Sequence, residues 1–247
     1  MASAESTFNE LEILGSESDC SYLAGRRSRM HYRLALSLSA SRYEHLLERG
    51  WRRFGRTLFR PICGTCRECR GLRIDIAAFR PSKSQRRARN RNAELQLTVQ
   101  APTVTDEHIA LYNAYHRDMS RRRDWPYHEM TRDHYEESFL DGEFSFSREF
   151  QYRLNDRLVA LGIVDMTGQA MSSIYFIHDP SLRDQSPGTM SVLREVEVGQ
   201  KTGHRWLYMG YYIRDCPSMN YKNRFQPHQI LNNYVADDEP AVWQPPE

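Results

Sequence analysis

The segment QYRLNDRLVALGIVDMTGQAMSSIYFI (residues 151–177) decides the fold. Apolar and polar residues alternate along much of it with a period of two, which is typical of strands with one buried face. Turn residues interrupt the alternation at Asn155-Asp156 and again at 167–169. The segment is therefore predicted to form three antiparallel strands, 151–154, 157–165 and 171–177.

Helical spacing flanks this meander on both sides. Thr105 is expected to cap one helix, Thr131 to begin a second, and Ser186 to begin a third that Gly203 closes. Residues 206–213 follow as a buried strand. The order helix, helix, three antiparallel strands, helix, strand predicts an α/β (α+β) chain with a GNAT-like acyltransferase domain, whose mixed, mainly antiparallel sheet splays open around an acyl donor.

The first third of the chain carries different signals. Residues 31–39 alternate as a strand, 41–50 have the spacing of a short helix, and 72–76 are predicted to form another strand. The polar run 80–92 breaks the pattern and is expected to be a loop that connects two domains. The predicted division is an N-terminal domain with the cysteines and the basic segment, 1–92, and a C-terminal GNAT-like domain, 93–247.

The composition is that of a folded protein. Of the 247 residues 40% are hydrophobic and 27% are charged, which excludes wholesale disorder. No apolar run approaches the roughly 18 residues of a spanning helix. The first 25 residues hold five acidic and no basic side chains, unlike a secretory signal with its positive start. The chain is therefore expected to be cytoplasmic, with no membrane partner.

Basic charge is concentrated in one stretch, although the formal net charge is only +2. Residues 42–91 hold 15 basic and 4 acidic side chains. Within them, six cations follow one another without an acid, which is the pattern expected for binding a phosphate backbone. A solvated charged face is the alternative interpretation. The six candidate nucleic-acid ligands are Arg80, Lys83, Arg86, Arg87, Arg89 and Arg91.

Three cysteines form a CxxCxxC cluster, and a fourth lies far upstream. Two-residue spacing lets neighbouring thiolates turn onto one ion, so zinc or an iron–sulfur cluster is a candidate occupant. Reduced structural cysteines are the alternative. The candidate ligands are Cys20, Cys63, Cys66 and Cys69.

Two loops are further candidates for function. Gln185–Gly188 lies between a predicted strand and a helix, where free backbone N–H groups can bind an anion such as the pyrophosphate of coenzyme A. Met190 stands where such loops carry a small residue, which weakens a coenzyme A site. Residues 211–227 gather tyrosines, a thiol and three cations at the exit of a strand, and loops on a rigid scaffold often carry function. His178, next to Asp179, is a candidate base.

Taken together, five motifs resemble the aminoacyl-tRNA protein transferases, and most closely their bacterial branch, the aspartate/glutamate leucyltransferases. The resemblance covers about residues 10 to 235. The chain has Ser-Pro-Gly where the family usually shows Ser-Leu-Gly, and Met209-Gly-Tyr-Tyr where it shows Leu-Gly-Tyr-Trp. The motifs, with x for any residue, are Cys20-Ser-Tyr22-Leu, Phe59-Arg-Pro-x-Cys63-x-x-Cys66-x-x-Cys69, Ser82-x-Ser-Gln-Arg-Arg87, Ser172-Ser-x-Tyr175-x-x-x-Asp179-Pro and Gly210-Tyr-Tyr-Ile-x-x-Cys216-x-x-Met219-x-Tyr221-Lys222-x-x-Phe225-x-Pro227.

The resemblance implies an aminoacyltransferase that moves leucine, or alternatively arginine, from charged tRNA onto the N-terminal Asp or Glu of a protein and so marks that protein for degradation. Aminoacyl-tRNA is then a co-substrate, and the transfer chemistry requires no cofactor. The bacterial motifs favour leucine. The basic run would hold tRNA phosphates, which predicts salt-sensitive binding.

Roles for single residues follow as hypotheses. Donors around Ser172, Ser173 and Tyr212 would stabilise the tetrahedral oxyanion, and Lys222 or Tyr221 would help the ribose oxygen to leave. An arginine must pair with the carboxylate of the acceptor, and the two candidates near the last motif are Arg214 and Arg224.

Two other classes of function stay open at this point. A coenzyme A-dependent N-acetyltransferase would explain the second half of the chain but neither the basic run nor the cysteines. A nucleic-acid-binding protein with a cysteine-bound metal would explain the first half only.

Overall fold

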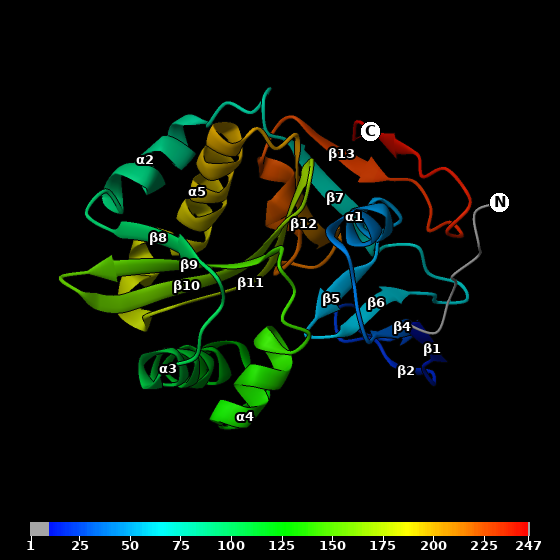
Figure 1. The fold of residues 1–247 in the computed structure, drawn as a ribbon, viewed down its shortest axis with the longest axis horizontal. Coiled ribbons are helices and arrows are strands. Elements are labelled where there is room, and N and C mark those ends of the chain that lie inside the picture. Colours follow the sequence, from blue (N-terminus) through cyan, green and yellow to red (C-terminus); the bar gives the residue numbers. More distant parts are fainter. Residues whose placement is uncertain (1–9, 247) are drawn as a thin grey trace.

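The computed structural model describes residues 10–246 and is built around an eight-stranded mixed sheet (Figure 1). The strands follow one another across it in the order β14-β13-β7-β12-β11-β10-β9-β8. All neighbouring pairs are antiparallel except β11 and β12. The bounds are β7 Arg70–Asp75, β8 Gln96–Gln100, β9 Ser147–Leu154, β10 Arg157–Met166, β11 Ala170–His178, β12 Trp206–Tyr212, β13 His228–Leu231 and β14 Trp243–Gln244.

The predicted meander is confirmed as β9, β10 and β11, and with it the mixed, mainly antiparallel fold class. β12 then returns parallel to β11, but the two strands are paired only from Ala170 opposite Trp206 to Ser172 opposite Tyr208. Beyond Ser172 no ladder joins them within the described residues, so the sheet opens at this point. That opening is the predicted splay of the acyltransferase fold.

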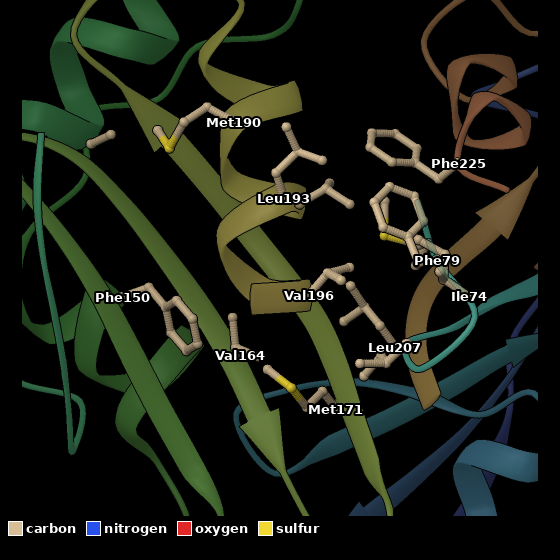
Figure 2. Packing of buried hydrophobic residues seen from close by; sticks show 14 of the residues in the cluster. Ile74, Phe79, Phe150, Val164, Met171, Met190, Leu193, Val196, Leu207 and Phe225 are labelled. Atoms are coloured by element: carbon tan, nitrogen blue, oxygen red, sulfur yellow. The ribbon is translucent and has the colours of Figure 1, made fainter. Parts of the chain in front are cut away.

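Helices cover both faces of the sheet (Figure 1). α5 (Pro187–Thr202) and α2 (Lys83–Arg91) lie side by side on one face, and α3 (Asp106–Arg123) lies on the other. Apolar side chains of α5 pack onto the strands and exclude water between the two layers (Figure 2). The labelled side chains of this contact include Met190, Leu193 and Val196 from the helix and Phe150, Val164, Met171 and Leu207 from the sheet.

A smaller sheet in the order β1-β4-β6-β5 precedes the large one. The predicted helix 41–50 is α1 (Ala40–Glu48), with Ser39 rather than Ser41 as its N-cap. Gly50 follows it with a φ of 81°, a left-handed conformation that favours glycine. The strands are β1 Glu10–Leu14, β4 Met30–Ala35, β5 Arg52–Phe54 and β6 Thr57–Pro61.

The polar run 80–92, predicted to be a connecting loop, forms α2 instead. The hydroxyl of Ser82 accepts from the backbone N–H of Gln85, and the side chain of Gln85 accepts from the N–H of Ser82, which is a capping box. Gln85, Ala88 and Asn92 are buried. These three small or polar residues have the helical spacing i, i+3, i+7 but form no strong apolar stripe, and the prediction missed this spacing.

β7 comes from the range assigned to an N-terminal domain, yet it hydrogen-bonds to β12 on one side and β13 on the other. The large sheet therefore crosses position 92, and the division into two domains stays a prediction. No helix of residues 10–246 is long and apolar enough to cross a membrane. The remaining elements are β2 Ser18–Asp19, β3 Arg27–Ser28, α4 Arg132–Tyr135 with a π-helical turn Glu136–Leu140, and the 3-10 turns η2 Pro180–Gln185 and η3 Asn220–Arg224.

Candidate active site

A pocket of about 440 Å³ opens at the splay of β11 and β12. β11, α5 and the loop after β12 supply most of its wall. β12 has a bulge beside the pocket: its pairing with β7 shifts register between Tyr208 and Tyr211. Gly210 lies in the bulge with a φ of 77°, a conformation that only glycine adopts readily. The polar lining includes Ser173, Ser191, Glu195, Tyr221 and Lys222, and the apolar lining includes Ile174, Phe176, Val192 and Met209.

Glu195 is a buried carboxylate in the wall of this pocket, with only 1% of its surface exposed. Its Oε1 accepts from the hydroxyls of Ser191, at 3.0 Å, and Ser173, at 3.4 Å. Its Oε2 has no hydrogen-bond partner in the described part of the chain. Burial raises the pKa of Glu195 to about 7, against the opposing effect of the two hydroxyls. A carboxyl with such a pKa can exchange protons near neutral pH.

Glu195 was not predicted from the sequence, although a signal was present. Glu195 stands one turn after Ser191 and directly before Val196, on the side of α5 that packs against the sheet. A charged residue on the apolar side of an amphipathic helix is costly unless it is paired, and it therefore indicates function.

Lys222 lines the same pocket from η3 and is 7% exposed. Its Nζ donates to the carbonyl oxygen of Tyr211 at 2.6 Å and contacts Met219 Sδ at 3.3 Å. Burial, with a further contribution from the positive charge of Arg52, lowers the pKa of Lys222 to about 7. An ammonium has three N–H donors, so at least one remains for a substrate.

Arg52, which was also not predicted, binds β11 at the point where its pairing with β12 ends. Its Nη1 donates to Ser172 Oγ at 2.7 Å, and its Nη2 donates to the carbonyl oxygen of Ser173. A Cβ at Gly210 would lie 3.3 Å from Arg52 Nε. Arg52 thus links β5 of the small sheet to β11. Because many arginines surround Arg52 in the sequence, nothing distinguished it as a site residue.

The other predicted site residues are divided between the pocket and its surroundings. Ser173, Tyr221 and Lys222 line the pocket together. Ser172 is fully buried on Arg52, and Tyr212 packs against the principal core, so neither is part of the lining. The two candidate acceptor-binding arginines, Arg214 and Arg224, are exposed and are also outside the lining.

His178 lines the pocket as well, but the carboxylate of Asp179 does not orient it. The Nδ1 of His178 contacts the backbone oxygen of Asp179 at 2.9 Å. The Asp179 carboxylate accepts from Ser181 and pairs with Arg157 at 2.7 Å. Burial lowers the pKa of His178, so its imidazole is neutral at neutral pH.

The basic helix α2 lies next to the start of α5, which in turn borders the pocket. Arg91 donates to Ser186 Oγ at 3.1 Å, and Asn92 Nδ2 donates to the carbonyl oxygen of Gln185 at 2.8 Å. At the other end of α2, Gln85 Nε2 donates to the carbonyl oxygen of Arg224 at 3.1 Å. Five of the six predicted nucleic-acid ligands are exposed, and Arg89 is half-buried and lies 3.6 Å from Glu197.

The cysteines of the CxxCxxC cluster lie outside the lining of this pocket. Cys63, Cys66 and Cys69 line a second pocket of about 380 Å³. Burial, and then the negative charge of neighbouring thiolates including that of Cys20, raises the pKa of Cys69 to about 12. Within residues 10–246 no three Cys, His, Asp or Glu side chains form a group that could hold a metal ion. We therefore assign no step of the reaction to a metal, and metal binding by the four candidate cysteines stays a prediction that elemental analysis would test.

A meander, a helix that begins beside the opening, and a parallel strand that parts from its neighbour are the arrangement of a GNAT-like acyltransferase fold. Family models for the N and C termini of the arginine-tRNA-protein transferases match residues 18–87 and 107–232. The aspartate/glutamate leucyltransferase of Helicobacter hepaticus is 34% identical over 234 residues, which cover 95% of this chain and 97% of the relative. The chain belongs to the aspartate/glutamate leucyltransferase family.

Other similar proteins have the same name. The aspartate/glutamate leucyltransferase of Campylobacter jejuni is 35% identical over 222 residues, with 90% of this chain and 93% of the relative covered. That of Halorhodospira halophila is 35% identical, with coverages of 87% and 91%. Among solved structures, a domain from Agrobacterium fabrum described as part of a lysylphosphatidylglycerol synthetase is 12% identical, with a TM-score of 0.49 over 85% of this chain and 64% of that one.

Proposed function

We propose that this protein transfers leucine from leucyl-tRNA to the N-terminal Asp or Glu of acceptor proteins, in the cytoplasm, and thereby creates a signal for degradation. The observation that carries the proposal is the full-length similarity to relatives named aspartate/glutamate leucyltransferase. Arginine is the alternative donor, because the two matching family models are named for arginine-tRNA-protein transferases.

The arrangement of α2, α5 and the pocket supports a tRNA-dependent reaction. Phosphates of the acceptor stem would lie along the exposed cations of α2. The start of α5 lies between α2 and the pocket, and its dipole favours the last phosphates of the tRNA. The esterified 3′ end would then enter the pocket, where Ile174, Phe176 and Val192 offer apolar surface to a leucine side chain.

The chemistry is a direct acyl transfer. The neutral amine of the acceptor attacks the ester carbonyl, the carbon–oxygen bond to the ribose breaks, and the ribose oxygen takes up a proton. Holding both reactants in one pocket can supply about 7 to 11 kcal/mol of the activation free energy. Of the predicted hydroxyl donors, Ser173 and Tyr221 line the pocket; the hydroxyl of Ser173 donates to Glu195, so Tyr221 is the one available to the oxyanion.

The test offers labelled leucyl-tRNA and, separately, labelled arginyl-tRNA to peptides that begin with Asp, Glu or Ala. Leucine on the Asp and Glu peptides alone would support the proposal. Arginine in its place would keep the chemistry and change the donor. If tRNA binds but neither label is transferred, the protein is a nucleic-acid-binding protein rather than a transferase.

A further inference from the structure

The lining of the pocket contains two charged side chains. Glu195 on α5 and Lys222 on η3 are the charged acid and base of its lining within the described residues, and the rest of the lining is neutral apart from the titratable His178. An N-terminal Asp or Glu carries the complementary pair, an α-amino group and a side-chain carboxylate. We propose that Lys222 binds the side-chain carboxylate of the acceptor residue while Glu195 binds its α-amino group. This inference rests on the proposed function.

The case for Glu195 begins with its unsatisfied oxygen. A buried acceptor atom without a partner is costly, and native structures keep such atoms mainly where a ligand or water completes them. Oε1 is held by Ser191 and Ser173, so the direction of the carboxylate is fixed and Oε2 is the atom left without a partner. An α-ammonium group offers three N–H donors and a positive charge to this oxygen.

The case for Lys222 rests on its position. Arg214 and Arg224, the cations expected to bind the acceptor, do not line the pocket, whereas Lys222 does. A carboxylate that enters the pocket would form a charge-assisted hydrogen bond with the Nζ of Lys222 and favour the charged form of the amine. Acceptors with a neutral first residue would leave a buried ammonium without its partner, which is a basis for selection.

The proton balance is simple. The Glu195 carboxylate takes one proton from the α-ammonium group and leaves a neutral amine. The amine nitrogen attacks the ester carbonyl, its second proton ends on the ribose oxygen, and the products are a new amide bond and a free tRNA hydroxyl. Glu195 then returns its proton to water. No other reactant is needed.

Few other groups around Glu195 titrate in the relevant pH range. Arg52 faces it from β5. Burial raises the pKa values of Tyr152 from β9 and Tyr221 from η3, so both stay neutral. Lys222 and His178 line the same pocket and complete the set of titratable groups. A pH profile therefore reports mainly on Glu195, Lys222 and the acceptor amine.

The first experiment compares peptides that begin with Asp and Asn in the wild type and in Lys222→Met, with leucyl-tRNA as donor. The ratio of kcat/KM for Asp over Asn is expected to fall by about 10- to 100-fold in the variant, because a hydrogen bond to a charged group is lost. A ratio within one protein does not depend on the fraction that folds. Lys201→Met, at the exposed end of α5, is the control.

The second experiment measures the rate of leucine transfer against pH in Glu195→Gln. The acceptor α-amino group has a pKa of about 7.7 to 8.0, so a base is most needed below that value. The transfer rate of the variant is expected to be about tenfold or more below that of the wild type at pH 6.5. Near pH 9, where the amine is already neutral, the two rates should be similar. Glu48→Gln, on α1 and outside the pocket, should match the wild type throughout.

Three outcomes would overturn the inference. They are an unchanged Asp-to-Asn ratio in Lys222→Met, a Glu195→Gln profile parallel to that of the wild type, and a Glu195→Gln protein that changes donor preference between leucine and arginine. The last result would place Glu195 against the donor side chain. A wild-type protein that transfers neither amino acid would instead reject the proposed function itself, so the two failures are distinguishable.

Discussion

Glu195 is a residue whose protonation should affect folding as well as transfer. Its pKa in the folded protein, about 7, lies above the ordinary glutamate value of 4.5. Between these two values the folded state binds more protons than the unfolded state, so the free energy of unfolding falls as pH rises through this window. Glu195→Gln should therefore gain stability relative to the wild type at pH 8, on the order of 1 to 3 kcal/mol, but not at pH 4. Denaturant unfolding at the two pH values measures this difference, and an equal effect at both would contradict it.

Gly210 is the second residue whose substitution should have a measurable effect on stability and transfer. Its φ of 77° strains any other residue, and a Cβ would press on Arg52 Nε at 3.3 Å. Gly210→Ala should lower the free energy of unfolding by about 1 to 3 kcal/mol and shift the guanidinium that holds the end of the β11 pairing. We expect slower leucine transfer at saturating tRNA even where the protein is fully folded. Gly203→Ala, whose Cβ would meet nothing within 4 Å, is the control for the cost of a positive φ alone.

At the scale of elements, α2 is the part predicted to bind tRNA. Arg87→Glu should weaken tRNA binding, and it should reduce the slope of log K against log salt by about one, because each phosphate contact releases roughly one counterion. Filter binding at several salt concentrations measures the slope. Lys201→Glu makes the same charge change at the far end of α5 and should leave it unaltered. Equal slopes for Arg87→Glu and the wild type would exclude α2 from the tRNA interface.

The secondary-structure elements differ in how far they could be predicted from the sequence. The meander was predictable because period-two alternation and turn residues act locally. α2 was not, because a capping box and burial of Gln85 and Ala88 make a helix of a run that is polar by composition. The pocket was only partly predictable: a motif supplied Ser173 and Lys222, but Arg52 reaches β11 across 120 positions of sequence, and no local pattern encodes such a contact.

At the scale of the whole molecule, a buried ion pair in the described part of the chain links the small sheet to the large one. Arg53 of β5 and Asp165 of β10 are 2% and 0% exposed, and two hydrogen bonds join them. Asp165→Asn should lower the free energy of unfolding by about 3 to 5 kcal/mol, since it leaves Arg53 buried without its partner. Asp19→Asn breaks an exposed pair with Arg27 and should have little effect. Similar unfolding midpoints for the two variants would contradict this role of the ion pair.

For the whole molecule, we propose that it moves leucine onto acidic N-termini. The most direct test of this proposal offers leucyl-tRNA and arginyl-tRNA together, in equal amounts, to an equimolar mixture of peptides beginning with Asp and Ala, followed by mass spectrometry of the products. We expect one added leucine on the Asp peptide and no change in the Ala peptide. Arginine on the Asp peptide, or leucine on both peptides alike, would contradict it.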